Sequence, residues 1–550
     1  MLPVSRMFMP RLGAAILFST LLAPCTFSQT AQSGSASAHS HPVAAERLGK
    51  VEFKTDCNAA AQAEFNRAMA LYHSFWWPAA SKAFEAVAQA DPTCGMAHWG
   101  RAMVILDNPF AWPANLASKL KDVVAALDAA RSTGLKSQRE KDYVEAVAAF
   151  VRDHEKVDHR TRLQAYDDAM AEVARRYPDD KEAAILSSLV TSANFNPTDK
   201  TYANQLKAAK SLERFVTSDP DHPGVAHYMI HSYDYPPIAK HGVEAAKKYA
   251  TIAPDSPHAL HMPSHIFTRL GHWRESIEAN RASSQAASDA TFDPHHAHDY
   301  LVYAHLQLAQ DRAAREALEQ SRSMKLVDNF GAAYAYAAMP ARLALERNDW
   351  REAVALPLTP GADAYPWKKY PQAEAVNAFA KAIGAGRSGD AAAAREQQQR
   401  LFALRDAAKE AKLGYWVEQI DIQADIVGSL ALCAEGKSDA CIEEMRKAAA
   451  REDGTEKHVV TPGPIIPARE LLADLLLASG QAGAALQEYE AVLNKEPNRY
   501  RAVLGAARAA SRTGDESRAR DLFKQLAALG KDADSGRDGL EEARQSLNRG

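Results

Sequence analysis

A 34-residue period near the C-terminal end constrains the fold of this chain more than any other feature. In "ARELLADLLLASGQAGAALQEYEAVLNKEP" and the stretch after it, three residue types recur 34 positions apart: Gly480 and Gly514, Ala485 and Ala519, and Tyr489 and Phe523. Each unit has the pattern of two amphipathic helices joined by a glycine turn. The alanine allows the helices to approach closely, and the aromatic ring fills the gap to the next unit. Pro497 cannot continue a helix and closes one unit.

These residue types at these offsets resemble the tetratricopeptide repeat, a helix–turn–helix unit of the same length. The stretch "FNRAMALYHSFWWPAASKAFEAVAQADP" resembles it too, with matching residues at Ala68, Ala80, Phe84 and Pro92. Further units fit near 223–256, 257–290, 291–324, 334–367, 375–408 and 422–455. Met-Pro precedes Trp by eleven residues in two places, 262 to 273 and 339 to 350. No run of alternating strand residues is evident. The resemblance implies an all-α, tetratricopeptide-type α-solenoid, a right-handed superhelix of helix-turn-helix repeats.

The chain is too long for one ordinary core, so an extended repeat array or several domains are expected. The patterns divide it into eight segments: a signal peptide at 1–28, a flexible linker at 29–48, N-terminal repeats at 49–109, degenerate helical repeats at 110–222, His-rich repeats at 223–324, further repeat-like units at 325–460, a C-terminal repeat pair at 461–533 and a tail at 534–550.

The first thirty residues are typical of an export signal. Arg6 and Arg11 precede an apolar run from Leu12 to Pro24, which is too short to span a bilayer. We therefore expect an exported protein, periplasmic in a Gram-negative cell, with no membrane span. A lipoprotein is the competing interpretation, because Cys25 follows the apolar run. Pro24 fits a lipidation motif poorly, so a lipid anchor at Cys25 is disfavoured.

Four cysteines follow this leader, and export would permit disulfides between them. Cys433 and Cys441 flank a glycine-containing turn, and Cys57 and Cys94 lie near the starts of successive repeats. Either pair could form a bridge, and isolated buried thiols are the alternative. Neither pair has zinc-finger spacing.

Four segments carry a narrower resemblance: "LYHSFWW", "ADPTCGMAHWG", "HMPSHIFTRLGHW" and "TPGPIIPARELL". They are similar to a family of exported bacterial tetratricopeptide-repeat proteins that are generally labelled by their repeats alone. The resemblance covers nearly all of the chain after residue 48. It implies the fold and export, and it leaves the activity open.

Histidines are concentrated in one part of the chain, where 12 of the 19 lie between His222 and His305. With repeats starting at residues 223, 257 and 291, one column holds His227, His261 and His295, and a second holds His231, His265 and Asp299. The two columns are one helical turn apart, so they share one face of the first helix in each repeat. In the family that the repeats resemble, this face lines a concave groove. Other groove positions hold Asp234, His258, Arg269 and Tyr303.

Three interpretations of this cluster remain open. The first is a site for one transition-metal ion (Zn, Cu, Fe or Ni), with His231, His261, His265 and Asp299 as ligands. The second is a metal-free groove for a protein, a peptide or a small anionic ligand, contacted by His227, Asp234, His258, Arg269, His295 and Tyr303. The third is a set of histidines that only hydrogen-bond one another.

Composition and motifs narrow the function further. The net charge is −4 and no long Lys/Arg run is present, which argues against nucleic acid as a partner. No P-loop, GxGxxG or GxSxG motif occurs, so catalytic residues are unknown. We therefore favour a binding or scaffold protein whose groove takes a ligand. The more specific hypothesis is that this ligand is a metal ion. A metal-dependent hydrolase or oxidase that uses the same His/Asp cluster is the alternative.

Overall fold

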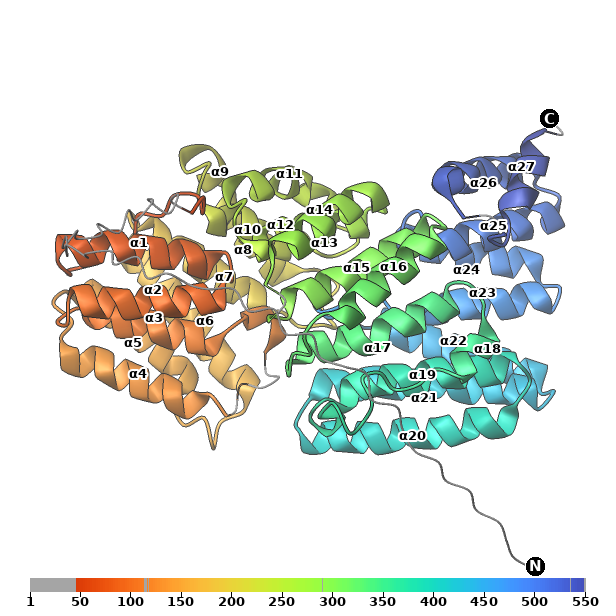
Figure 1. Ribbon diagram of the computed structural model, residues 1–550, viewed down its shortest axis with the longest axis horizontal. Coiled ribbons are helices and arrows are strands. Elements are labelled where there is room, and N and C mark those ends of the chain that lie inside the picture. Colours follow the sequence, from red (N-terminus) through yellow and green to blue (C-terminus); the bar gives the residue numbers. More distant parts are fainter. Residues whose placement is uncertain (1–45, 113–115, 117, 289, 535, 549–550) are drawn as a thin grey trace, which may run out of the picture. The chain divides into compact units, whose positions relative to one another are not determined.

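Paired antiparallel helices joined by short turns build the part of the chain that the computed structural model describes (Figure 1). The described residues are 46–112, 116, 118–288, 290–534 and 536–548. Glu46–Gly550 cluster as one compact unit. The predicted signal peptide, Cys25 and the linker up to residue 45 lie outside the described residues. Within those residues the regular structure is helical and no β-strand occurs, so the predicted all-α class is confirmed.

Most helices pair with the next one along the chain, as a repeat array requires. The N-terminal third comprises α1 (Ala59–His73), α2 (Trp77–Ala90), α3 (Gly95–Leu106), η1 (Pro109–Ala111), α4 (Leu120–Thr133), α5 (Gln138–Val151), α6 (His159–Arg176), α7 (Lys181–Ala193), α8 (Ala203–Glu213) and α9 (Phe215–Ser218). The His-rich third comprises α10 (Pro223–Tyr233), η2 (Ala239–Gly242), α11 (Val243–Ile252), α12 (Pro257–His261), α13 (Pro263–Arg269), α14 (Trp273–Ala286), α15 (Asp293–Gln307) and α16 (Asp311–Ser323).

The remaining helices continue the array to the C-terminal end. They are α17 (Phe330–Leu345), α18 (Trp350–Val354), η3 (Trp367–Lys369), α19 (Pro371–Arg387), α20 (Ala391–Glu410), α21 (Gly414–Ala434), α22 (Ser438–Asp453), α23 (Ala468–Ala478), α24 (Ala482–Lys495), α25 (Tyr500–Thr513), α26 (Glu516–Leu529), η4 (Gly530–Asp532) and α27 (Leu540–Asn548). Every helix in the described part of the chain is too short or too polar to span a bilayer.

The glycine turn and the aromatic plug take the places that the repeat pattern predicts. Gly480 and Gly514 have left-handed backbones, with φ of +84° and +79°, at the turns that follow α23 and α25. The ring of Tyr489 on α24 packs against Gly505 on α25 so closely that a Cβ there would lie 2.2 Å from the ring. Phe84 on α2 contacts Gly100 on α3 in the same way. Repeats at both ends of the described chain therefore use the same packing device.

Both cysteine pairs that the sequence offered as possible bridges are bonded in the structure. Cys57 pairs with Cys94, which joins the segment before α1 to the start of α3. Cys433 pairs with Cys441, which joins the end of α21 to α22. The alternative of isolated thiols does not apply to these four residues.

Buried apolar side chains gather in two large cores that meet inside the His-rich third. One core runs from Leu48 to Phe267, and the other runs from Trp273 to Ala543. The helices that carry most of the clustered histidines, α10, α12 and α13, belong to the first core, and α15 contributes to the second. The histidines therefore lie where two apolar cores adjoin.

Candidate metal centre

Three consecutive repeats bring their histidines together from the first helix of each. α10 carries His227 and His231, while α12 and α13 together form an interrupted helix that carries His258, His261 and His265. The interruption comes at Pro263, which has no N–H to donate to the preceding turn. The third repeat is offset by one residue from the predicted register. His296 of α15, and not His295, lies against His261, with ring centroids 4.5 Å apart.

His261 at the end of α12, His265 of α13 and His296 of α15 form the first of two triads, which we call the α13–α15 triad. Each offers one ring nitrogen, and these three atoms lie within 4.8 Å of one another. The Nε2 atoms of His261 and His265 are only 3.0 Å apart. All three side chains are buried, and burial lowers the pKa of each ring, which favours neutral imidazoles.

Hydrogen bonds to the outer nitrogens fix the tautomers of two of these rings. The Nδ1–H of His265 donates to Asp234 Oδ2 at 2.8 Å, and the Nδ1–H of His261 donates to Asn280 Oδ1 at 2.6 Å. The amide of Asn280 is oriented by its own Nδ2, which donates to the Ser276 carbonyl at 2.7 Å. A neutral imidazole carries one hydrogen, so both Nε2 atoms present lone pairs to each other.

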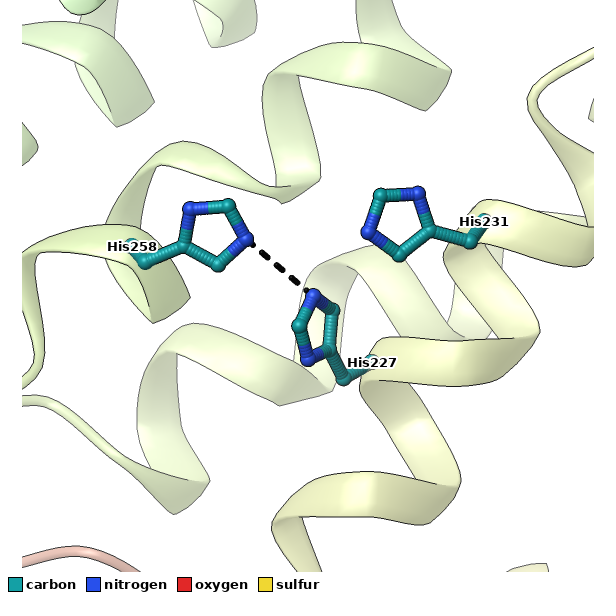
Figure 2. Close-up of side chains that lie close together, drawn as sticks. All are labelled: His227, His231 and His258. Atoms are coloured by element: carbon teal, nitrogen blue, oxygen red, sulfur yellow. Dashed lines mark hydrogen bonds between the residues drawn. The ribbon is translucent and has the colours of Figure 1, made fainter. Parts of the chain in front are cut away.

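His227, His231 and His258 form the second triad, the α10–α12 triad, and Figure 2 shows the three rings turned toward a common point. The Nε2 atoms of His227 and His258 are 3.2 Å apart. The Nδ1–H of His227 donates to the carbonyl of His73 at 2.6 Å, which leaves its Nε2 without a hydrogen. His231 stacks on Phe110, with ring centroids 3.9 Å apart.

Asp234 is the charged centre behind the α13–α15 triad. Besides His265, its carboxylate accepts from Arg269 Nε at 2.8 Å and from Lys457 Nζ at 3.0 Å. Burial by itself would raise the pKa of Asp234, but Lys457 and Arg269 hold it well below the usual range. Burial in turn lowers the pKa of Lys457 to about 8. Asp234 and Arg269, both predicted as groove residues, therefore support the histidines from behind.

A cavity of about 640 Å³ adjoins both triads. Two histidines of each triad line it: His231 and His258 from one, His265 and His296 from the other. The rest of the lining includes aromatic rings and charged side chains: Phe75, Trp76, Trp77, Trp112, Phe292, Phe330, Tyr370 and His458, with Asp107, Lys119, Asp293, Asp328 and Lys369. Lys119 pairs with Asp107 at 3.1 Å and Lys369 with Asp328 at 2.5 Å.

Three predicted site residues lie away from the two triads. Asp299, predicted as a metal ligand, accepts instead from Arg342 Nε at 3.0 Å in a fully buried ion pair, and it belongs to neither triad. His295 contacts the Ser321 hydroxyl at 2.9 Å and the Lys325 carbonyl at 3.1 Å. The hydroxyl of Tyr303 donates to Glu496 Oε2 at 3.2 Å.

The offset of α15 explains these three placements. The helix equivalents of His261 and His265 are His296 and Tyr300, each 35 residues further along, and the rings of Tyr300 and His265 have centroids 5.3 Å apart. Because one extra residue precedes α15, each groove position on this helix is occupied by the residue that follows the predicted one. The adjacent histidines of "HHAHDY" were the available signal, because either could have continued the column.

Two further residues reach the site from a distant part of the sequence. Lys457 contacts Asp234, and His458 lines the cavity; both lie in the segment between α22 and α23. Burial lowers the pKa of His458 to about 3. No local pattern links Lys457 to Asp234, 223 residues earlier, so only the tertiary structure could reveal this contact.

In a third group of potential ligands, His73, Glu182 and His222, both histidines are hydrogen-bonded to the carboxylate, whereas His222 Nδ1 is buried without a partner among the described residues. His73 Nε2 lies 3.0 Å and His222 Nε2 2.8 Å from the two oxygens of Glu182. Tyr228 OH lies 2.8 Å from His73 Nδ1 and can donate to it. Each nitrogen in these contacts has a matching donor or acceptor, so this group has the pattern of a structural network.

Comparison with known proteins bears on the fold. Residues 476–536 match the family model described as tetratricopeptide repeat, and no curated protein matches the chain significantly. The match and the helix pairs fit a tetratricopeptide-repeat protein. Tetratricopeptide repeats typically bind proteins or peptides, and the buried histidine groups are compatible with a bound metal ion.

Proposed function

We propose that this tetratricopeptide-repeat protein binds a transition-metal ion through His261, His265 and His296 and takes a ligand in the adjoining cavity. One observation carries the proposal. The Nε2 atoms of His261 and His265 face each other at 3.0 Å, and the hydrogen of each ring is already committed to Asn280 or Asp234. Two lone pairs at this distance repel each other unless a cation lies between them.

The geometry suits a tetrahedral ion. With metal–nitrogen bonds of about 2.0–2.1 Å, two ligand nitrogens on one zinc ion are about 3.3 Å apart. The observed separation of 3.0 Å is close to this value. Asp234 and Asn280 supply the outer hydrogen bonds that orient metal-bound histidines and raise their basicity.

An extra proton between the two nitrogens is the competing explanation. A second hydrogen on His265 would give an imidazolium beside Asp234. However, Arg269 and Lys457 already balance that carboxylate, and burial lowers the pKa of both rings. Coordination of a metal ion needs only the neutral rings that burial favours, whereas the shared proton needs one ring in its charged form. The all-imidazole donor set suits Zn, Cu, Ni or Fe.

Catalysis is the second candidate, and the cavity is the observation that favours it. Three protein ligands leave a fourth position on a tetrahedral ion, and His265 and His296 line the cavity. An activated water at such a position is the basis of zinc hydrolases. This version predicts hydrolase or oxidase activity by the same histidines, and the binding version predicts ligand capture without turnover.

We also propose that the protein is exported, as the leader pattern indicates. The two disulfides support this, because such bonds persist in oxidising compartments. Fractionation of the native host, followed by detection of the cleaved chain outside the cytoplasm, tests this proposal independently of the metal.

The test of the metal site is elemental analysis of untagged protein purified from its native compartment. We expect at least one metal ion per chain in the wild type, and the double variant His261→Ala/His265→Ala should bind one ion fewer. His272→Ala is the matched control, because His272 is an exposed histidine at the turn before α14. Folded wild-type protein that neither carries nor takes up Zn²⁺ or Cu²⁺ would contradict the proposal.

A further inference from the structure

We infer that the α10–α12 triad holds a second metal ion, so that His227, His231 and His258 and the α13–α15 triad together form a dinuclear site on one cavity. This inference rests on the proposed function, because it adds a second ion beside the first. Its own support comes from residues that the first ion does not use.

His231 is the strongest observation. Its ring is 4 % exposed, and within the described residues neither of its nitrogens has a hydrogen-bond partner. A buried imidazole with both nitrogens unpaired costs folding free energy, and native proteins rarely retain one without a use. Stacking on Phe110 holds the ring in place, so its orientation is set by packing and not by a polar partner.

The other two rings of this triad present their nitrogens to the same point. The hydrogen of His227 is committed to the His73 carbonyl, so Nε2 offers a lone pair. His258 Nε2 lies at hydrogen-bond distance from that atom, 3.2 Å (Figure 2), and this separation is also close to that of two ligands on one tetrahedral ion. A bound ion would take the place of this hydrogen bond, with the hydrogen of His258 on Nδ1. The backbone carbonyl of His73 plays the supporting role here that Asp234 and Asn280 play in the other triad.

The two triads are neighbours. His258 and His261 lie on the same short helix, with ring centroids 6.0 Å apart, although they belong to different triads. The rings of His231 and His265 have centroids 5.9 Å apart. Ligand atoms within 4.8 Å of one another form two separate groups of three, which is the arrangement for two ions and not for one.

A shared cavity makes the pair one functional site. Two histidines from each triad line the same cavity of about 640 Å³. Three imidazoles would leave each ion an open coordination position, and the cavity lies beside both triads. Six neutral imidazoles leave the charge of two divalent ions unbalanced, so an anionic oxygen donor is the ligand class that would bridge them. This deepens the proposed function by naming the chemistry of the cavity ligand.

The test is a metal titration of chelator-stripped full-length protein with Co²⁺, followed by visible absorption and elemental analysis. We expect two ions per chain in the wild type, one in His231→Ala, one in His265→Ala and none in the double variant His231→Ala/His265→Ala. His272→Ala should keep both ions. His258 and His296 also line the cavity. If His231→Ala or His265→Ala does not fold, His258→Gln or His296→Gln replaces it as the variant of the same triad.

Proximity is measured on the same proteins loaded with Cu²⁺. Wild-type protein loaded with two equivalents of Cu²⁺ should give an electron paramagnetic resonance signal that is broadened, or whose integrated intensity is well below that of two isolated ions. Each single variant should give the full signal of one isolated ion.

Each outcome separates the two proposals. One ion in the wild type, lost in His265→Ala but kept in His231→Ala, would overturn the dinuclear site and leave the proposed function intact. Two ions with the signal of two isolated Cu²⁺ centres would overturn the shared site. No bound ion in folded wild-type protein would overturn both.

Discussion

The buried carboxylate of Asp234 contributes both to the stability of the fold and to the candidate metal site. Its two oxygens accept from Arg269, Lys457 and His265, and the side chains of all three are buried. The carboxylate thus balances the cations and fixes which nitrogen of His265 is bare. A charge removed here affects both roles.

We predict that Asp234→Asn destabilises the protein by about 3–5 kcal/mol, because Arg269 and Lys457 lose their counter-charge. Metal affinity should fall about 10- to 100-fold, because His265 loses its charged partner. Chemical denaturation and a metal titration measure the two effects separately.

Asp299→Asn is the matched control for this substitution. It also removes a buried carboxylate from an arginine, Arg342, but lies outside both triads. We expect lower stability with unchanged metal affinity. If Asp299→Asn loses the metal and Asp234→Asn keeps it, the ligand set predicted from the sequence holds and our assignment fails.

At the scale of elements, the spacing between successive repeats depends on glycines that face an aromatic ring. Gly505 on α25 contacts Tyr489, and Gly100 on α3 contacts Phe84. Gly483 on α24, in contrast, has open space where a Cβ would be. The same residue type therefore has different roles in neighbouring helices.

We predict that Gly505→Ala lowers the free energy of unfolding by about 1–3 kcal/mol, because the added methyl group overlaps the Tyr489 ring. Gly483→Ala should leave stability unchanged or raise it by up to about 1 kcal/mol, because alanine favours the helix. Thermal melts of the two variants provide the comparison. Equal effects at the two positions would show that the close contact does not set the repeat spacing.

At the scale of the whole molecule, the proposed metal centre bridges two apolar cores. His261 and His265 lie on helices of the core that ends at Phe267, while His296 lies on α15, whose Leu301 and Val302 belong to the other core. An ion bound by all three histidines therefore ties the cores together. Metal binding and global stability should be coupled.

We predict that a chelator lowers the melting midpoint of the wild type, because metal bound only to the folded state stabilises it by about 4 kcal/mol at a free concentration 1,000 times Kd. The double variant His231→Ala/His265→Ala, which loses one ligand from each triad, should melt at the same temperature with and without the chelator. A wild-type melting midpoint that does not change when the chelator is added would argue against the link between the cores.

The sequence was sufficient where the structure depends on local periodicity. The 34-residue spacing of Gly480, Ala485 and Tyr489 from their partners predicted the helical hairpins and their contacts, because helix faces and glycine turns follow directly from residue type. It also brought His231 and His265 to neighbouring helices, where their ring centroids lie 5.9 Å apart. Periodicity failed at α15, where one extra residue moved His296 into the column predicted for His295.

By itself the sequence thus determined the all-α repeat fold and the gathering of histidines on the first helices of three repeats. Only the tertiary structure decided how these histidines divide into two triads. Hydrogen bonds that His261 and His227 donate to Asn280 Oδ1 and to the His73 carbonyl select the bare nitrogens, and Lys457 comes from a segment far along the chain. These contacts depend on side-chain direction and on long-range packing, neither of which a linear spacing encodes.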